Sequence, residues 1–236
     1  SITGEEDTGP QKVGVAVSDI MSGMYAATGI LTALVSRGLT GVGQHVDIPL
    51  YDAQVGWLAN QNMNYLIGNE NPGRLGTSHP NLVPYQAFST SDGHLVLAVG
   101  TDRQFMVLMR TLGLDECAED PRFMTNADRV ENRELLVPKL VKVFKQKSTA
   151  DWLQKLTAKG VPAGPINTIA QVFSDSYAKE RKLVRMVKHR DAGVIPTVAN
   201  PVRFSHTPVS YRNAPPVLGE HTVEVLTKEL GLTDQA

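Results

Sequence analysis

The sequence contains one cysteine, no long apolar run and almost no net charge, and each absence narrows what the protein can be. Cys117 has no second cysteine to pair with, so no disulfide forms within the chain, which fits a reducing compartment. The longest apolar runs, such as GILTALV, fall far short of the about 20 residues that a membrane-spanning helix needs. A net charge of −1 gives no general attraction to nucleic acid or to an anionic membrane. We therefore expect a globular chain without nucleic-acid or membrane partners.

Metal and nucleotide motifs are also missing. No two of the six histidines stand at the spacing that places two ligands on one helix face, and Cys117 lies in the acidic stretch DECAED, which disfavours a reactive thiolate. The Gly41-Val42-Gly43 segment lacks the third glycine of a dinucleotide fingerprint. It also lies between a predicted helix and a predicted strand, whereas the fingerprint needs the opposite order. We expect no metal and no tightly bound cofactor.

The first 67 residues alternate between strand-like and helix-like patterns. Valines at every second position predict a short strand over residues 13–17. The apolar period then becomes that of a helix over 20–38, which we expect to be buried on most sides. Alternation over 46–50 predicts a second strand, and a second helix follows over 52–67. The order strand, helix, strand, helix is typical of a parallel α/β layer.

The chain changes character after residue 67. Residues 68–80 are rich in glycine, proline and asparagine, and a loop of this length often marks a functional or interdomain segment. A hairpin is predicted to turn at Ser91-Asp92-Gly93. Further predictions are a helix around 105–112, a helix capped by Asn126, a helix opened by Ser148 and ended by Gly160, a rigid loop at VPAGPIN, strands over 184–209 and a final helix over 219–230.

Asp19 stands where the first predicted strand meets the first predicted helix. Aspartate is a favoured helix N-cap, so a purely structural interpretation is available. Backbone amides and the helix dipole also stabilise an anion at such a position, and a carboxylate kept ionised in an apolar setting can attack an activated acyl group. Ser18, Ser22 and Gly23 are small enough for a substrate to approach closely. The local pattern leaves both interpretations open.

Five stretches of the chain resemble, in order, those of the class III CoA-transferase family, which includes formyl-CoA, carnitine, and succinyl- or glutaryl-CoA transferases. They are SDIMSGMYAATGILTALVSRGLTGVGQHVDIPLYDA, GRLGTSHPNLVPYQAFSTSDGHLVLAVGTDRQF, DPRFMTNADRVENR, GVPAGPIN and PPVLGEHT. None is specific alone, but together they extend from about Val13 to the last helix. The resemblance therefore covers most of the chain.

The resemblance implies that Asp19 is the catalytic nucleophile, because the family places its catalytic acid at this junction. The implied enzyme moves CoA between carboxylic acids through an aspartyl anhydride and an aspartyl-CoA thioester. Its substrates are an acyl-CoA and a small carboxylic acid, and ATP is not needed. Water must be excluded, because hydrolysis of either intermediate would waste it.

The family also has a glycine-rich loop over its intermediates, and the matching stretch here is GRLGTSHP at 73–80. This stretch departs from the consecutive glycines of the formyl-CoA enzyme, since Gly73 and Gly76 alone remain. The resemblance implies that Gly76, Thr77 and His79 bind substrate, although an exposed loop histidine without a role explains His79 equally well. The different loop disfavours formate and oxalate and favours a dicarboxylate of the succinate or glutarate type.

The family fold implies a Rossmann-like large domain and a smaller α+β domain in an interlocked homodimer. On that basis, residues 1–67 are the central part of the Rossmann-like CoA-binding domain, 68–80 the active-site loop, 81–191 the small domain, and 192–236 a segment that returns to the large domain. Only 18 residues precede Asp19, so we expect the middle and C-terminal part of a family member, which binds CoA poorly alone. A cytoplasmic location fits, or an organellar matrix in a eukaryote.

Two other functions are compatible with the same residues. A 2-methylacyl-CoA racemase of the same superfamily uses an acid at this position as one base, together with a histidine from the N-terminal part. A non-catalytic binding or scaffolding subunit would retain the fold without the chemistry. The SDIMSG and SHPNLVPYQAF stretches favour the transferase.

Overall fold

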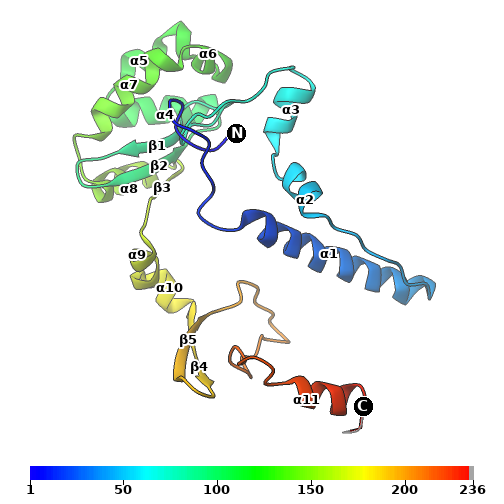
Figure 1. Cartoon of the computed structure of the whole chain (residues 1–236). Helices are drawn as coiled ribbons and strands as arrows, with labels where there is room; N and C mark the ends of the chain where they lie inside the picture. Colours follow the sequence, from blue (N-terminus) through cyan, green and yellow to red (C-terminus); the bar gives the residue numbers. More distant parts are fainter. Residues whose placement is uncertain (234–236) are drawn as a thin grey trace. The chain divides into compact units, whose positions relative to one another are not determined.

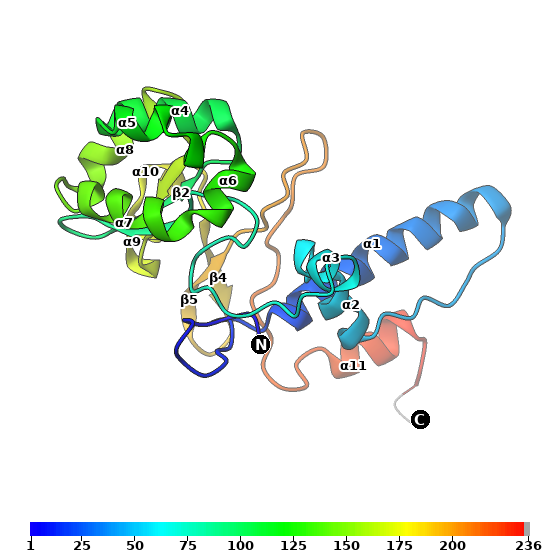
Figure 2. The ribbon, with the colours of Figure 1, turned by 90° about the horizontal axis from the view of Figure 1, so that it is seen from above.

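The computed structural model describes residues 1–233. The chain divides into two compact units, the first ending at Ile166 and the second beginning at Asn167 (Figure 1). The first unit contains a three-stranded antiparallel sheet (Figure 1), and the second contains a two-stranded antiparallel sheet, whose two strands are labelled in Figure 2. The predicted mixture of helices and strands is therefore confirmed. Among the described residues, no helix has both the length and the apolar character to cross a bilayer. The domain limits at 67, 80 and 191 stay predictions.

The first unit contains one long helix, α1 (Val17–Thr40). Its N-cap residue, Ala16, contributes only backbone, and no side chain caps the first amides. Gly41 ends the helix in the left-handed region at φ 75°, where its N–H donates to Arg37 O over 2.8 Å. The predicted strand over 13–17 is wrong, because no strand lies before residue 85 in the described chain.

The prediction that α1 is buried on most sides is also wrong. None of its residues is buried, and Ile20, Leu31 and Val35 are 54%, 63% and 66% exposed. The half-buried side carries small residues, among them Gly29, where an added β-carbon would lie 3.1 Å from Cγ1 of Val46. The large apolar side chains of α1 therefore form a surface that nothing in residues 1–233 buries.

The segment between α1 and residue 67 contains helices and no strand. Residues 46–50 are extended but unpaired, so the second predicted strand and the parallel layer are absent from the described chain. A strand is stable only when a neighbouring strand takes its backbone hydrogen bonds, and none lies beside this segment. The predicted helix over 52–67 is two helices, α2 (Leu50–Gly56) and α3 (Asn60–Leu66), separated where Ala59 adopts φ 51°.

The sheet of the first unit is built from β1 (Tyr85–Ser89), β2 (His94–Ala98) and β3 (Ala163–Pro165), in that order. The hairpin predicted at Ser91-Asp92-Gly93 is confirmed. β3 lies in the segment VPAGPIN, which was predicted to be a rigid loop. That prediction is wrong, because the backbone of this segment pairs with β2, which is far away in the sequence. Local turn signals do not reveal such a distant partner.

Helices gather around this sheet and supply most of the core (Figure 1). Ser148 caps its helix as predicted. The helix predicted to start at Asn126 and to carry Leu135, Leu136, Leu140 and Phe144 is two helices, the first capped by Thr125, not Asn126, in a capping box with Asp128, and the second starting at Arg133. The elements are α4 (Asp102–Leu112), α5 (Asp115–Glu119), η1 (Pro121–Phe123), α6 (Asn126–Glu131), α7 (Arg133–Phe144) and α8 (Thr149–Thr157). The largest fully buried apolar side chains are Trp152, Phe88, Phe105, Phe123, Phe144, Leu95, Leu97, Leu108, Met109, Leu136 and Leu140.

The second unit is smaller and less buried. The strands predicted over 184–209 are confirmed only as far as residue 198, and the final helix is confirmed over 222–229. Its elements are α9 (Ile169–Ser174), α10 (Ser176–Glu180), β4 (Val184–His189), β5 (Gly193–Val198), α11 (Thr222–Glu224) and the π-helix η2 (Val225–Glu229).

Candidate functional site

Asp19 lies in the first turn of α1 and is exposed. It is the third helical residue, so the interpretation of Asp19 as the N-cap is wrong: Ala16 holds that position. Negative charge is favoured near the unpaired amides and the positive dipole end of a helix. Within residues 1–233 the Asp19 carboxylate makes no hydrogen bond and no ion pair. It is therefore an accessible anion at a helix N-terminus.

The polar neighbours of Asp19 connect the first turn of α1 to α2. The Ser18 hydroxyl donates to Oε1 of Gln54 over 2.5 Å, and the Ser22 hydroxyl donates to Ser18 O over 2.7 Å. Gly23 has no atom within 4 Å of the position that a β-carbon would occupy. Close approach of a substrate to Asp19 past these small residues stays a prediction. Gln54 was not predicted, because its contact spans 36 positions.

The loop over 68–80 is held at Gly76 by the first residues of the chain. The Gly76 N–H donates to Gly4 O over 2.9 Å. The Arg74 guanidinium donates to the carbonyls of Glu5 and Glu6, over 3.2 and 3.3 Å. These contacts fix the loop on one side.

The other end of the loop lies against the start of β1. The Ala87 N–H donates to the Thr77 hydroxyl oxygen over 3.1 Å, and the His79 N–H donates to Tyr85 O over 2.9 Å. The His79 ring stacks on the Tyr85 ring, with centroids 5.2 Å apart and planes 19° from parallel. The structure thus places Gly76, Thr77 and His79 in one ordered loop. No hydrogen bond of the described residues connects this loop to Asp19.

His79 is half-buried and close to a cation. Arg133, the first residue of α7, donates to the carbonyls of His79 and Pro80 over 3.3 and 2.8 Å. Burial first, and the Arg133 charge second, lower the pKa of His79 below its usual value. The imidazole is therefore neutral at neutral pH. Arg133 was not assigned a role from the sequence, although it lies in the DPRFMTNADRVENR stretch.

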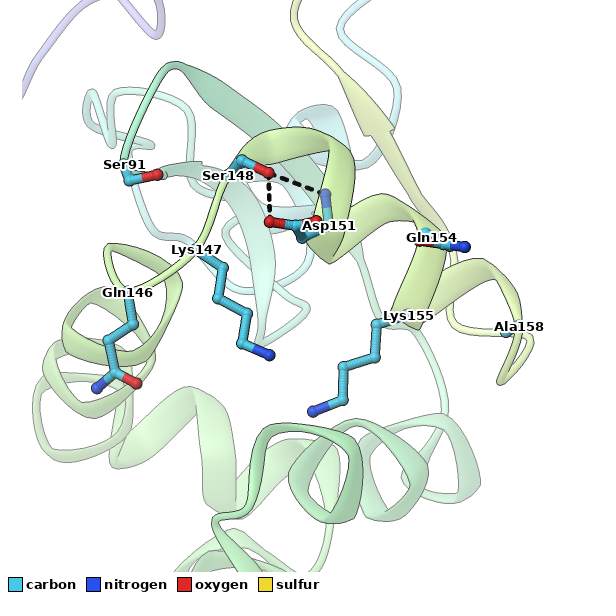
Figure 3. Close-up of a pocket in the computed structure, with 8 residues that line it drawn as sticks. All are labelled: Ser91, Gln146, Lys147, Ser148, Asp151, Gln154, Lys155 and Ala158. Carbon is cyan, nitrogen blue, oxygen red and sulfur yellow. Dashed lines mark hydrogen bonds between the residues drawn. The ribbon is translucent and has the colours of Figure 1, made fainter.

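A separate groove of about 770 Å³ lies beside the N-terminus of α8 (Figure 3). Lys147 and Lys155 extend toward the same space, and their Nζ atoms lie 5.5 and 5.4 Å from the ring centroid of Trp152. Asp151, the acid in its lining, accepts a hydrogen bond from the Ser148 hydroxyl over 2.6 Å. Lysine stems that cover an indole explain this arrangement without a ligand. None of the residues predicted for the site lines this groove.

Metal and thiol chemistry have no candidates in the described structure. Within residues 1–233 no three His, Cys, Asp or Glu side chains come together as metal ligands. Cys117 is buried, and burial is the main cause that raises the pKa of its thiol. The neighbouring Glu116 and Asp120 carboxylates raise it further, as the acidic stretch predicted.

We predict that Gly76→Ala lowers the free energy of unfolding by about 1 kcal/mol, because a residue with a β-carbon is strained in the left-handed region. Gly76 adopts φ 56°, and its new β-carbon would also lie 2.5 Å from Oε2 of Glu5. The matched control is Gly73→Ala, where φ is not positive and no atom lies within 4 Å. Urea denaturation of the three proteins measures the difference. Equal stability of the two variants would contradict the role of the Gly76 conformation.

The chain is similar to proteins of one known family. Residues 1–222 match the CoA-transferase family III. The chain is 44% identical to the succinate–glutarate CoA-transferase of Agrobacterium fabrum, over 97% of this chain and 57% of that protein. It is 40% identical to the succinyl-CoA:glutarate CoA-transferase of Mus musculus, over 97% of this chain and 52% of that protein. The chain thus spans about half the length of the curated relatives it matches.

Solved structures agree with this assignment. The crystal structure of a CAIB/BAIF family protein from Brucella suis shares 44% identity and a TM-score of 0.73, over 96% of this chain and 59% of that chain. The crystal structure of Rv3272 from Mycobacterium tuberculosis, in its orthorhombic form, is 29% identical with a TM-score of 0.77. The match covers 92% of this chain and 57% of that chain. The resemblance found in the sequence is confirmed, and the chain belongs to CoA-transferase family III.

Proposed function

We propose that this chain is part of an enzyme that transfers CoA between two carboxylic acids. The observation that carries the proposal is 44% identity to a succinate–glutarate CoA-transferase over nearly the whole chain. The exposed carboxylate of Asp19 at a helix N-terminus supports it, because covalent transfer needs an accessible anionic nucleophile. The substrates are an acyl-CoA and a small carboxylic acid, and no bound cofactor takes part.

Asp19 is the nucleophile in the proposed reaction. A carboxylate oxygen of Asp19 attacks the thioester carbonyl carbon, the C–S bond breaks, and CoA thiolate leaves an acyl-aspartyl anhydride. The thiolate then attacks the carbonyl carbon of Asp19, which releases the first acid as a carboxylate and leaves an aspartyl-CoA thioester. The acceptor carboxylate attacks the carbonyl carbon of this thioester and expels CoA thiolate, which leaves a second anhydride between Asp19 and the acceptor. The thiolate then attacks the acceptor's carbonyl carbon, and the Asp19 carboxylate leaves as the new acyl-CoA forms. Asp19 is regenerated, and no ATP or net proton is consumed.

The loop over 73–80 binds the acceptor acid in this proposal. Gly76, Thr77 and His79 lie in one ordered stretch, and a neutral imidazole N–H is a suitable donor to a carboxylate. The acceptor is a dicarboxylate of the succinate or glutarate type. Two relatives support this class, since one is a succinate–glutarate CoA-transferase and the other a succinyl-CoA:glutarate CoA-transferase.

The proposal extends to the assembly. The complete protein has a Rossmann-like large domain and forms a homodimer located in the cytoplasm or an organellar matrix, without nucleic-acid or membrane partners. The exposed apolar side chains of α1, among them Ile20, Met24, Leu31 and Val35, support the proposal that another part of the assembly packs against this helix. Single exposed apolar residues are ordinary, but several along one helix are not.

A CoA-transfer assay tests the proposed function. The full-length protein is incubated with succinyl-CoA and glutarate in deuterated water, and the CoA esters are separated by mass. We expect glutaryl-CoA to form without deuterium at the α-carbon. Deuterium at the α-carbon without CoA exchange would instead show a racemase. Neither product, from a folded protein and a panel of carboxylic acids, would favour a non-catalytic subunit.

A further inference from the structure

The loop that contains His79 is anchored to α6 and α7 on the side away from Gly76. Arg133 holds the carbonyls of His79 and Pro80, as described above. Asn126 continues the same anchor: its amide nitrogen donates to Asn81 O over 2.8 Å, and its amide oxygen accepts from Val83 N over 3.2 Å. The backbone from 79 to 83 is therefore fixed by side chains from a distant part of the sequence. Such a fixed backbone can hold one side chain in a single orientation.

The His79 ring itself has restraints on its face and on one nitrogen. Its face stacks on Tyr85, and Nδ1 accepts a hydrogen bond from Asn81 N over 3.0 Å. Because Nδ1 is the acceptor, a neutral ring carries its proton on Nε2. Within residues 1–233 Nε2 has no hydrogen-bond partner, and it is not among the buried polar atoms without one. Nε2–H is therefore a donor that is open to solvent.

Arg133 also affects the charge of this ring. Burial is the larger cause that lowers the pKa of His79, and the guanidinium, bound to the carbonyls beside the ring, lowers it further. A protonated ring would form an ion pair with an acceptor carboxylate and make that carboxylate a poorer nucleophile. A neutral Nε2–H instead orients the carboxylate while leaving its charge available. Arg133 thus fixes the backbone that presents the His79 ring and adds to the effect of burial on its charge.

We propose that Arg133 is a positioning residue that holds His79 with its Nε2–H available as a donor to the carboxylate of the acceptor acid. This inference rests on the proposed function for its substrate and on the loop geometry for its residues. Arg133 does not need to touch the substrate, because it acts through the His79 ring and the carbonyls of residues 79 and 80.

The first arm of the test is structural and needs no activity. Long-range nitrogen NMR of the chain reports the tautomer and the pKa of His79. We expect Arg133→Met to raise the pKa of His79 and to reduce the Nε2–H tautomer, because the charge and both carbonyl contacts are lost. Arg133→Lys keeps the charge and should restore the lowered pKa. Arg110→Met is the matched control, because Arg110 is an exposed residue in the last turn of α4.

The second arm measures CoA transfer from succinyl-CoA to glutarate by the full-length protein. We expect Arg133→Met to raise KM for glutarate about 3- to 10-fold, the range for one lost hydrogen bond, while KM for succinyl-CoA stays unchanged. An unchanged NMR signature in Arg133→Met, or a changed signature with an unchanged KM for glutarate, would overturn the proposal. If the wild-type protein transfers no CoA at all, the proposed function is wrong, and so is the role of His79 in binding the acceptor acid. The NMR measurement would still show whether Arg133 fixes the His79 ring.

Discussion

Asp19→Asn is expected to lower kcat for CoA transfer by about 10⁴-fold or more, as removal of a covalent nucleophile does in other enzymes. Asparagine has nearly the same shape but no anionic oxygen, so neither the anhydride nor the thioester can form at normal speed. The fold should hardly change. Asp19 is exposed and bonds to no described side chain, so the loss is its interaction with the helix dipole, less than about 1 kcal/mol. Steady-state kinetics of the full-length protein and urea denaturation measure the two effects.

Asp52→Asn is the control for this experiment. Asp52 is also an exposed acid in the first turn of a helix, α2, so its replacement changes charge and helix dipole in the same way. Kinetics of Asp52→Asn should match the wild type. Chemical trapping gives an independent reading: hydroxylamine added with succinyl-CoA should modify the peptide that contains Asp19 in the wild type. Substantial transfer by Asp19→Asn, or a trapped adduct on another residue, would show that the nucleophile lies elsewhere.

The cap interpretation of Asp19 failed for a local reason. Ser18 and Asp19 are both good N-caps, but the helix begins at Val17, before either of them. The Ser18 hydroxyl is then free of a capping role and donates to Gln54 instead. A polar pair in the sequence indicates where a helix starts only to within a turn. In the structure Asp19 is therefore exposed but does not cap the helix, whereas the sequence pattern was compatible with both properties.

Predictions succeeded where the relevant contacts are close in sequence. The hairpin before β2 needed only its turn residues, and Ser148 needed only the first turn of α8 to act as a cap. Predictions failed where a partner was remote or absent. Residues 46–50 have the alternation of a strand, and Val46 and Ile48 are half-buried as a strand would require, but no neighbouring strand takes their hydrogen bonds.

The candidate site follows the same rule. The density of glycine and proline over 68–80 was enough to predict a loop, whereas His79 was selected by the family resemblance alone and its role stays a prediction. The restraint on His79 was not predictable, because the contact from Arg133 spans 54 positions and is made to a backbone carbonyl. A carbonyl is present at every residue, so the sequence carries no mark of which one a guanidinium will bind.

Arg129→Met is expected to lower the free energy of unfolding by about 2–3 kcal/mol, because buried backbone carbonyls lose their charged donor, whereas its partner Asp102 is 56% exposed and stays solvated. Arg129 has no exposed surface. Its Nε donates to Val83 O over 2.7 Å, and its NH1 group donates to Phe123 O over 3.0 Å. Its NH2 group donates to Asp102 over 2.8 Å, and the guanidinium lies 4.4 Å from the Phe105 ring centroid. Methionine fills similar space but leaves the carbonyls without donors.

Urea denaturation compares this variant with Arg122→Met, which removes an arginine that is 57% exposed and makes a two-point contact with Asp120, and which should cost clearly less than Arg129→Met, since exposed ion pairs contribute little. Equal free energies of unfolding for the two variants would contradict this prediction. They would mean that the packing of methionine compensates for the lost hydrogen bonds, as apolar residues do for some buried ion pairs. Because Arg129 binds the carbonyl of Val83, four residues after His79, its loss should also loosen the loop. Hydrogen exchange at Asn81 and Val83 should therefore rise in Arg129→Met and stay unchanged in Arg122→Met.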